Sequence, residues 1–331
     1  MSQPPSGAPD ASDPPVVPPG EACLAQERCR RRSTISGTTG LVAVLGDPLR
    51  HTLSPAMHNA ALQALGLDWV YMALRTPPGR LAAVLEGLEA VECRGLNITL
   101  PHKAEAAQLA QALSPLAARL GAVNTLVPRA EGGWFGTNTD VEGFLAPLRS
   151  DGAPWQGQQA LVLGNGGSAR AIVAALTELG MAPIVVAGRR QENLDRLLQA
   201  CRGWAPTLEG VPWSEDHLRP ALGGSALVVN TTPMGMARSA DPKPAASPLG
   251  PGDLDALPEG ATVYDLIYTP RPTALLQQAK ARGCRTIDGL EMLVQQGAAS
   301  LRLWTGQSEV PVAVMREAAL HQLAVQSPAP P

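Results

Sequence analysis

A glycine-rich turn between an apolar run and a helical pattern constrains this chain more than any other feature. The turn reads Gly164-Asn165-Gly166-Gly167-Ser168-Ala169; the apolar run covers residues 160–163 and the helical pattern covers residues 171–179. Strand, glycine turn and helix in that order are typical of a dinucleotide site, because the backbone can approach a pyrophosphate closely and the helix N-terminus faces its charge. Glycines also end strands for purely conformational reasons, so the spacing has an alternative without a ligand.

The segment after the next apolar strand predicts which dinucleotide binds. That strand covers residues 183–187, and Gly188-Arg189-Arg190 follows it, where NAD-binding chains carry an acidic residue for the ribose hydroxyls. Guanidiniums suit a 2′-phosphate, and a charge-assisted hydrogen bond contributes about 1.5–3 kcal/mol. We therefore expect NADP as the cofactor, with Arg189 and Arg190 at its phosphate. The alternative is an exposed basic pair that precedes the helical pattern 191–200 and binds nothing.

Length and composition favour a soluble chain of two domains. With 331 residues, 45% of them hydrophobic, the chain is long enough for two cores, and its net charge of −3 gives no reason to expect nucleic acid as a partner. No apolar stretch approaches the roughly 20 residues that span a bilayer, so we expect no membrane partner. The five cysteines are odd in number and include no C-x-x-C pair, and no H-E-x-x-H motif occurs. We expect a cytoplasmic protein without a metal.

Residues 1–37 differ from the rest of the chain. Seven prolines occur in the first twenty positions, and a basic run of Arg28, Arg30, Arg31 and Arg32 follows before any hydrophobic periodicity begins. This composition predicts a disordered tail. A targeting segment and a wrongly extended start are the alternatives, although scattered acidic residues argue against a transit peptide.

From residue 41 onward, short apolar strands alternate with helical patterns, which predicts an α/β fold. Strands are expected at residues 41–45, 69–74, 95–98, 125–127, 226–230, 262–267 and 285–287, helices at residues 56–65, 80–90, 103–112, 290–304 and 311–325, a hairpin turn at residues 131–133 and a surface loop at residues 239–252. We expect an N-terminal mixed α/β substrate domain over 38–139, completed by C-terminal helices in 290–326 that return to it. A Rossmann-type, doubly wound NADP-binding domain is expected over 140–289.

Polar residues stand where strands give way to helices, which is where ligands bind in open α/β sheets. Lys103 falls in the first turn of its helix, where the macrodipole disfavours a cation, so a partner is expected, and Asp140 is the candidate. Such a pair could exchange a proton with a substrate hydroxyl or carbonyl. Structural alternatives remain open: a surface lysine at Lys103, a helix cap at Asp140, and an N-cap at Ser54 before Pro55. Likewise Gln296 could face solvent on its amphipathic helix, and Met234 and Met236 could fill a core.

Several motifs in one order resemble the shikimate dehydrogenase family, from residue 41 to about residue 326. They are Gly46-Asp47-Pro48, His51-Thr52-Leu53-Ser54-Pro55 with His58-Asn59, Asn97-Ile98-Thr99-Leu100-Pro101-His102-Lys103, Gly121-Ala122-Val123-Asn124-Thr125, Asn138-Thr139-Asp140, Asn230-Thr231-Thr232-Pro233-Met234-Gly235-Met236, Asp265-Leu266-Ile267-Tyr268 and residues 288–296.

This resemblance implies reversible, NADPH-dependent reduction of 3-dehydroshikimate to shikimate, on the route to aromatic amino acids. It implies a catalytic role for Lys103 with Asp140 as its partner. The substrate's carboxylate and hydroxyls would be held by the residues that match the family's substrate positions: Thr52, Ser54, Thr99, Asn124, Gln296 and nearby Tyr268. The cofactor would contact the glycine turn, the two arginines and four further residues: Thr231, Met234, Ile267 and Gly289.

Three departures from the family pattern limit what the resemblance implies. Thr52 stands where the family usually has serine, which keeps the hydroxyl and adds a methyl group. Gly188-Arg189-Arg190 stands where the family often shows Asn-Arg-Thr, so two small polar side chains are replaced by a second cation and a glycine. Glu291 replaces a residue that is usually small.

Two other functions remain open. One is a quinate/shikimate dehydrogenase of broader substrate or cofactor use; an NAD-preferring version would be expected to carry an acidic residue near Gly188. The other is a non-catalytic, NADPH-sensing protein that binds a partner, for which loss of Lys103 or Asp140 would be the sign; both are present. We expect a small-molecule substrate and either a monomer or a homodimer.

Overall fold

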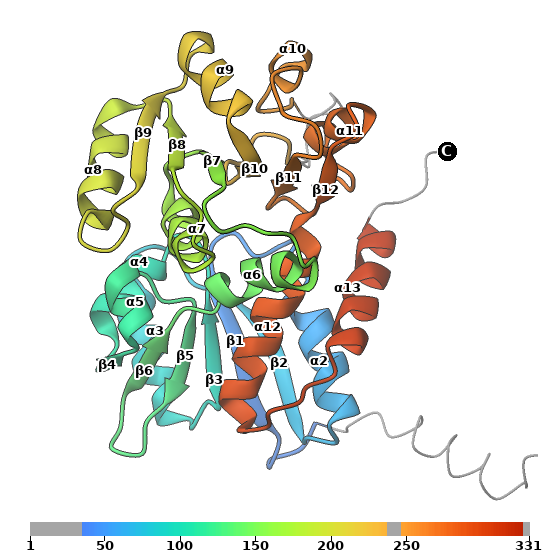
Figure 1. Cartoon of the computed structure of the whole chain (residues 1–331). Coiled ribbons are helices and arrows are strands. Elements are labelled where there is room, and N and C mark those ends of the chain that lie inside the picture. Colours follow the sequence, from blue (N-terminus) through green and yellow to red (C-terminus); the bar gives the residue numbers. More distant parts are fainter. Residues whose placement is uncertain (1–34, 237–245, 327–331) are drawn as a thin grey trace, which may run out of the picture. The chain divides into compact units, whose positions relative to one another are not determined.

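The computed structural model describes residues 35–236 and 246–326. Residues 1–34 of the expected tail and residues 239–245 of the expected surface loop therefore lie outside the described residues. The chain divides into two units, Met1–Thr39 and Gly40–Pro331. Both sheets and the helices around them belong to the second unit (Figure 1).

The first sheet is mixed, with the strand order β2-β1-β3-β5-β6-β4. Its strands are β1 (Gly40–Gly46), β2 (Trp69–Arg75), β3 (Gly95–Ile98), β4 (Ala112–Leu113), β5 (Thr125–Pro128) and β6 (Trp134–Thr137). Parallel pairs join β1 to β2 and β3, whereas β5 runs antiparallel to β3 and to β6. The β5–β6 hairpin turns at Gly132 and Gly133, whose φ angles of 90° and 73° suit glycine, as the sequence predicts.

Helices cover both faces of the first sheet. In β1, Val42 and Val44 pack with α2 (Ser54–Ala64), α12 (Gly289–Thr305) and α13 (Val312–Gln326). The alternate residues Ala43 and Leu45 pack on the other face with α3 (Leu81–Ala90), α4 (Lys103–Leu109) and α5 (Pro115–Leu120). Because successive side chains of a strand point to opposite faces, the apolar run of β1 supplies two cores at once.

The second sheet is parallel throughout its described pairs, with the strand order β12-β11-β10-β7-β8-β9. Its strands are β7 (Gln159–Leu163), β8 (Ile184–Gly188), β9 (Leu208–Pro212), β10 (Ser225–Asn230), β11 (Thr262–Asp265) and β12 (Arg285–Ile287). The chain order reverses between β7 and β10, which is the doubly wound arrangement whose switch point leaves a crevice at the carboxyl ends of the strands.

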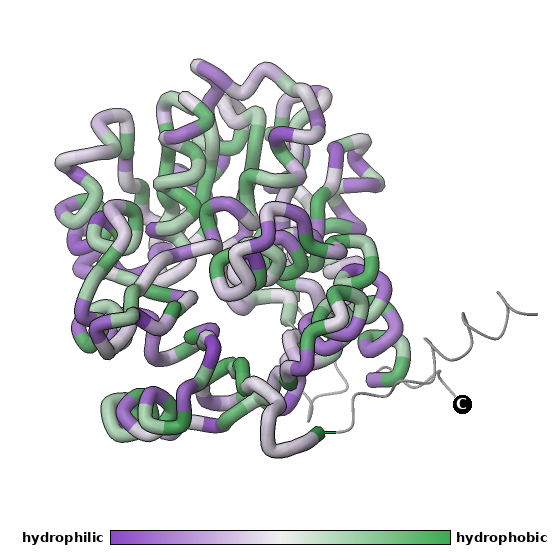
Figure 2. The backbone as a smooth tube through the Cα atoms, turned by 90° about the horizontal axis from the view of Figure 1, so that it is seen from below, coloured by the Kyte–Doolittle hydropathy of each residue, from purple (hydrophilic) through white to green (hydrophobic). Residues whose placement is uncertain are grey.

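Two layers of helices enclose the second sheet. Ala160 and Val162 of β7 face the core made with α6 (Asp140–Ser150), α7 (Gly167–Glu178) and α8 (Gln191–Cys201). Leu161 and Leu163 face the core made with α9 (Glu215–Gly223), α10 (Pro251–Leu254) and α11 (Ala274–Ala281). Figure 2 shows helical turns that alternate between hydrophilic and hydrophobic residues, as expected where one face of a helix lies on a sheet. The expected α/β fold is confirmed.

The C-terminal helices return to the first sheet. Leu290, Val294 and Leu301 of α12 join the core of β1 and α2, and the Trp304 indole donates to the Leu126 carbonyl oxygen of β5 at 3.0 Å. Figure 1 shows α12 and α13 beside β1, β2 and α2, although they follow the second sheet in the chain.

Two glycines let other helices approach α12 closely. A β-carbon on Gly143 of α6 would lie 2.7 Å from the Met292 carbonyl oxygen and 2.9 Å from the Gln296 amide nitrogen. One on Gly297 would lie 2.8 Å from the Met57 side chain of α2. A side chain at Gly143 would therefore force α12 away from α6, whereas one at Gly297 would displace the Met57 side chain of α2.

Several sequence expectations were wrong in detail. The helix expected at 103–112 ends at Leu109, because the Gln111 N–H donates to the Trp134 carbonyl oxygen and β4 joins β6. The strand expected at 262–267 ends at Asp265, whose side chain accepts from the Ile267 N–H. The short elements α5, α10 and β4, and also β9, α9 and α11, were not expected; pairing and packing, rather than a strong local pattern, define them.

We expect Gly143→Ala to destabilise the protein by about 1–3 kcal/mol, because the new methyl group meets backbone atoms of α12 that cannot rotate away. Gly87→Ala is the matched control: Gly87 also lies inside a helix, and nothing is within 4 Å of its added β-carbon. Helix propensity alone should make that change stabilising by up to about 1 kcal/mol. Urea unfolding measures both free energies. Equal shifts in the two variants would show that α6 and α12 do not require this close approach.

Candidate active site

A cavity of 360 Å³ brings together polar residues from distant parts of the sequence. It is lined by all eight residues that the sequence predicts for catalysis and substrate binding: Thr52, Ser54, Thr99, Lys103, Asn124, Asp140, Tyr268 and Gln296. Met236 and Leu293 complete the wall on the side of the second sheet and α12. A single cavity therefore contains residues from motifs that lie far apart in the sequence.

Lys103 and Asp140 form an ion pair in this cavity. The Lys103 ammonium lies 2.7 Å from Oδ2 of Asp140, and the two side chains are 25% and 12% exposed. Both residues begin a helix: Lys103 is the first residue of α4 and Asp140 the first residue of α6. A carboxylate is favoured at a helix N-terminus and an ammonium is disfavoured there, so Asp140 offsets the unfavourable position of Lys103.

The helix-cap alternatives for Asp140 and Ser54 are wrong. Asp140 follows the N-cap residue Thr139, and the Asn138 side chain accepts from the Asp140 N–H at 3.0 Å, so the Asp140 carboxylate is left for Lys103. Ser54 likewise follows the N-cap residue Leu53 and makes no capping bond, which leaves its hydroxyl at the cavity wall. Lys103 is also more than a surface lysine, because it is paired and three-quarters buried.

Asn124 holds the second oxygen of Asp140. Its Nδ2 donates to Asp140 Oδ1 at 2.9 Å and to the Thr139 hydroxyl at 3.0 Å, while its Oδ1 accepts from the Thr139 N–H at 2.8 Å. Gln296 Oε1 lies 3.4 Å from the same amide nitrogen. Asn124 thus fixes the direction of the carboxylate, and Gln296 faces the cavity rather than solvent.

A buried chain of hydroxyl and amide groups supports Asn124 from behind. Ser300 is fully buried; its hydroxyl donates to the Gln296 carbonyl oxygen at 3.0 Å, accepts from Asn97 Nδ2 at 2.9 Å and lies 2.8 Å from the Thr125 hydroxyl. The Thr125 hydroxyl donates to Asn124 Oδ1 at 2.9 Å. Each polar group has a partner, so the network costs little to bury and holds one geometry.

The His58-Asn59 motif anchors the wall that carries Ser54. His58 Nδ1 lies 2.9 Å from the Ser54 carbonyl oxygen, and its ring stacks on Tyr71 at 4.1 Å. Burial lowers the pKa of His58 to about 4, so this imidazole is neutral at physiological pH. Asn59 bonds to both backbone groups of Tyr71 on the edge strand β2, and the Tyr71 hydroxyl donates to Asn97 Oδ1 at 2.8 Å.

The remaining cavity walls are set by packing and burial. A β-carbon on Gly46 would lie 2.3 Å from the Thr99 side chain, so this glycine makes room for Thr99. The Thr52 hydroxyl accepts from the Ser54 N–H at 3.3 Å, which places both side chains in one turn. Burial raises the pKa of Tyr268, so its phenol remains a neutral hydrogen-bond donor.

The predicted cofactor residues lie at the carboxyl ends of the second sheet. Gly164 directly follows β7 with φ of 104°, and α7 begins at Gly167, so Gly166, Gly167 and Ser168 present an exposed helix start, with Ala169 buried against the strand. Arg189 and Arg190 follow β8 and are exposed; within residues 35–236 and 246–326, no hydrogen bond or ion pair engages either guanidinium. Room for a pyrophosphate beside two unpaired cations fits a phosphorylated dinucleotide.

A buried carboxylate supports the loop after β10. Asn230 Nδ2 donates to Asp265 Oδ1 at 2.9 Å and to the Met234 carbonyl oxygen at 3.1 Å, while Thr231 donates to the Leu163 carbonyl oxygen at 2.9 Å. Burial raises the pKa of Asp265. The loop therefore stands beside the glycine turn, with Met236 49% exposed at the cavity rather than filling a core.

Gly289 brings the start of α12 to the end of β11. A β-carbon there would lie 2.0 Å from the Leu266 carbonyl oxygen, and the Gly289 N–H donates to the Ile267 carbonyl oxygen at 3.2 Å. The structure thus gives Gly289 a packing role between Ile267 and α12.

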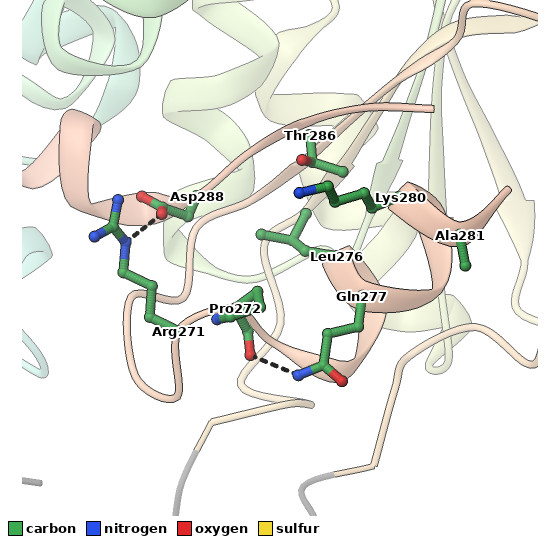
Figure 3. Close-up of a pocket in the computed structure, with 8 residues that line it drawn as sticks. All are labelled: Arg271, Pro272, Leu276, Gln277, Lys280, Ala281, Thr286 and Asp288. Carbon is green, nitrogen blue, oxygen red and sulfur yellow. Dashed lines mark hydrogen bonds and ion pairs between the residues drawn. The ribbon is translucent and has the colours of Figure 1, made fainter. Parts of the chain in front are cut away.

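A larger cavity of 640 Å³ lies beside α11 and β12 (Figure 3). Three of its polar side chains are engaged: Arg271 pairs with Asp288, which caps α12 through the Leu290 N–H at 3.0 Å, and Gln277 donates to the Pro272 carbonyl oxygen at 3.2 Å. The Arg271–Asp288 pair serves the start of α12, and none of the eight expected catalytic and substrate-binding residues lines this larger cavity. The smaller cavity around Lys103 is therefore the candidate active site.

Sequence reasoning assigned no role to several residues that shape this site. Asn97, Leu293 and Met236 line the cavity, and Thr125 and Ser300 lie behind Asn124. Asn97, Thr125, Met236 and Leu293 belong to the motifs that resemble the family, so these segments could have identified them. Ser300 stands four residues after Gln296, on the same face of α12, and only that spacing pointed to it.

The part of the chain that the structure describes contains no group of three histidine, cysteine, aspartate or glutamate residues able to hold a metal ion. Within the same residues, none of the helices has the length and apolar character of a membrane span.

Family models and curated relatives agree on one family. Residues 44–126 match the shikimate dehydrogenase substrate binding domain, and residues 289–320 match the shikimate 5′-dehydrogenase C-terminal domain. The chain is 48% identical over 295 residues to an NADP(+) shikimate dehydrogenase of Synechocystis sp., covering 88% of this chain and 98% of the relative. This protein belongs to the shikimate dehydrogenase family. A Thermosynechococcus vestitus relative of the same name is 50% identical over 285 residues, covering 86% of this chain and 96% of the relative.

A solved member of the shikimate dehydrogenase family has the same fold. The enzyme from Thermus thermophilus, crystallised in complex with NADP(H) and shikimate, is 40% identical with a TM-score of 0.74, and the match covers 86% of this chain and 99% of that one. The resemblance in sequence motifs is thus confirmed by relatives and by fold.

Glu291, a departure from the family pattern, has a partner. Both of its carboxylate oxygens accept from Arg316 of α13, at 2.8 and 2.7 Å, and Gln295 donates to it at 2.8 Å. The Arg316 guanidinium holds the pKa of Glu291 below its usual range. The larger side chain at position 291 therefore fastens α13 to α12, the helix that carries Leu293, Gln296 and Ser300.

We expect Glu291→Gln to lower the free energy of unfolding at pH 7 by less than about 1 kcal/mol, because both partners are partly exposed. A carboxyl group whose pKa is lower in the folded state stabilises that state fully at pH values above its pKa in the unfolded state, about 4.3. This stabilisation is lost as the pH falls through the pKa of the folded state. The gap between parent and variant should therefore close below about pH 4. Denaturant titrations across pH, with Glu317→Gln as an exposed-carboxylate control, measure it. A gap that stays constant down to about pH 3 would rule out the ion pair as its source.

Proposed function

We propose that this protein catalyses the reversible, NADPH-dependent reduction of 3-dehydroshikimate to shikimate, a step in the synthesis of aromatic amino acids. Membership of the family and the names of its NADP(+) relatives support the reaction. The observation that carries the proposal is the Lys103–Asp140 contact inside a cavity lined by hydroxyl and amide groups.

The cavity chemistry suits a small acid with several hydroxyl groups. Thr52 and Ser54 offer neutral donors to the carboxylate, and Tyr268 lies in the same wall. Thr99, Asn124 and Gln296 offer both donors and acceptors to ring hydroxyls. A site that hydrogen-bonds a substrate's hydroxyls rejects analogues without them, because its own buried groups would be left unpaired.

Lys103 would transfer the proton that the reaction needs, and Asp140 would position Lys103. When bound, the reduced nicotinamide supplies the hydride that converts the ketone to an alcohol, and the ketone oxygen must gain one proton. The Lys103 ammonium lies on the cavity wall, where it would hydrogen-bond that oxygen and deliver the proton. Asp140 holds the Lys103 side chain in place through the contact at 2.7 Å.

NADP would bind along the carboxyl ends of β7, β8, β10 and β11. The turn from Gly164 to Ala169 would receive the pyrophosphate, and Arg189 with Arg190 would receive the 2′-phosphate. The nicotinamide would contact Thr231, Met234, Ile267 and Gly289. Two of these residues, Met234 and Ile267, belong to the segments that bring Met236 and Tyr268 to the cavity wall. Arg189 and Arg190 are exposed, and neither guanidinium is paired with another of the residues that the structure describes, which supports this assignment.

The same assignment extends to domain roles and setting. Residues 38–139 with 290–326 would bind substrate, and residues 140–289 would bind NADP. The protein would work in the cytoplasm as a monomer or homodimer on a small-molecule substrate.

Purified protein mixed with shikimate should reduce NADP, and far more slowly NAD, when reduced nicotinamide is followed by absorbance. The preference follows from the arginine pair and the absence of an acidic residue at Gly188. Quinate serves as the comparison substrate, and equal rates with it would indicate the broader enzyme instead. No absorbance change with any pairing would leave a non-catalytic, NADPH-binding protein as the better account.

We expect Lys103→Ala to reduce turnover by roughly 10²- to 10⁴-fold, which is the usual contribution of a general acid or base, with little change in NADP affinity. Lys280→Ala, which removes a lysine from the other cavity, is the control and should retain full activity. Steady-state kinetics and cofactor titration measure the two effects. If Lys103→Ala turns over as fast as the parent, the proton reaches the substrate by another route.

A further inference from the structure

The Asn165 side chain joins the glycine turn to the segment that carries the two arginines. Asn165 stands second in the turn, directly after Gly164, and its Nδ2 donates to the Arg190 carbonyl oxygen at 3.3 Å. The backbone also links these segments, since the Gly164 N–H donates to the Ala187 carbonyl oxygen at 2.9 Å. Two contacts therefore set how far the arginine segment lies from the turn.

Gly188 provides the space that Asn165 occupies. A β-carbon on Gly188 would lie 2.4 Å from Asn165 Nδ2 and 3.0 Å from Asn165 Cγ, closer than non-bonded atoms approach. The φ angle of Gly188 is not among the positive values in this chain, so the glycine is needed for space rather than for its backbone conformation. Asn165 and Gly188 therefore form a matched pair: the carboxamide of one lies where a side chain of the other would be.

This contact controls the backbone from which both arginines project. Arg190 is the N-cap residue of α8 with an extended backbone, and Arg189 lies between it and Gly188. Both guanidiniums are exposed, and within the described residues neither makes an ion pair that would fix its direction. Their position relative to a bound nucleotide thus depends on the backbone that Asn165 holds.

We propose that Asn165 is a specificity-determining residue, which by holding the Arg190 carbonyl over Gly188 positions Arg189 and Arg190 for a 2′-phosphate. This inference rests on the proposed function, because it assumes that the turn binds a dinucleotide. It adds that the preference for a phosphorylated ribose depends on two things. One is the charge of the two arginines, and the other is the contact between the Asn165 side chain and Gly188.

The test measures binding rather than catalysis. Calorimetric titration of the full chain with 2′,5′-ADP and with 5′-ADP isolates the contribution of the 2′-phosphate, and NADP and NAD repeat the comparison with whole cofactors. Asn165→Ala should weaken 2′,5′-ADP and NADP by about 5- to 10-fold more than it weakens 5′-ADP and NAD, which is near the upper range for one lost hydrogen bond.

Gly188→Ala provides a second, independent variant, because its methyl group displaces the Asn165 amide without removing it. The same selective loss is expected, and the double variant should be no weaker than either single variant, since both changes break one contact. Gln191→Ala is the control: this neighbouring side chain donates to Asp195 within α8 and should change no affinity.

Three outcomes would overturn the inference. Equal losses for all four nucleotides would show that Asn165 acts on the shared pyrophosphate. Unchanged affinities in both variants would show that the arginine segment holds its position without Asn165. If the parent protein and an Arg189→Ala variant both bind the 2′-phosphorylated nucleotides no more tightly than the others, the proposed cofactor is overturned together with this inference. If the parent prefers the 2′-phosphorylated nucleotides, the proposed cofactor stands, and the Asn165 and Gly188 variants test this inference alone.

Discussion

The ion pair between Lys103 and Asp140 is the interaction on which the rest of the site depends. It places an ammonium at the start of a helix, where the macrodipole opposes it, and a carboxylate at the start of another, where the macrodipole favours it. The pair therefore holds the Lys103 side chain at a helix start that would otherwise disfavour it. Asn124 takes the second carboxylate oxygen, so Asp140 cannot turn away from Lys103 without losing a buried hydrogen bond.

Helix α12 connects this chemistry to the fold. It belongs to the core of the first sheet, yet it begins at the end of β11 in the second, where Gly289 lies against the backbone of Leu266. Gly143 and Gly297 let α6 and α2 approach it closely, and the same helix presents Gln296 to the cavity and Ser300 to the network behind Asn124. Glycines at the contacts of α12 with α6 and α2 therefore set the helix positions that bring the polar side chains together. The pair Glu291–Arg316 then fixes α13 on its outer side.

The six cavity residues other than Lys103 and Asp140 were implied by the resemblance to the shikimate dehydrogenase family rather than by local patterns. Prediction from local patterns reached the fold class, most of the strands and the Lys103–Asp140 pair, because apolar runs, a glycine turn and polar residues after strands mark them. It failed where the decisive partner lies elsewhere. The capping role considered for Asp140 was wrong, since Asn138 supplies the oxygen that accepts from the Asp140 N–H. Gly143 and the partner of Glu291 could not be found, because each is defined by a contact between elements more than twenty residues apart. Ser300 was marked only by its spacing from Gln296, although its partner Asn97 lies on another element. Helix α4 ended early for the same reason, because pairing of Gln111 with Trp134 overrode its local pattern.

Lys103 and Asp140 would face the substrate oxygen that gains or loses the proton, beside the carbon that exchanges the hydride. A crystal structure of the protein with shikimate and NADP+ tests this most directly. The account predicts one ring hydroxyl of shikimate within about 2.6–3.2 Å of Lys103 Nζ, with the carbon that bears it facing the nicotinamide and Asp140 still bonded to Asn124. Shikimate bound with its carboxylate at Lys103, and its reacting hydroxyl turned away from both residues, would contradict the account.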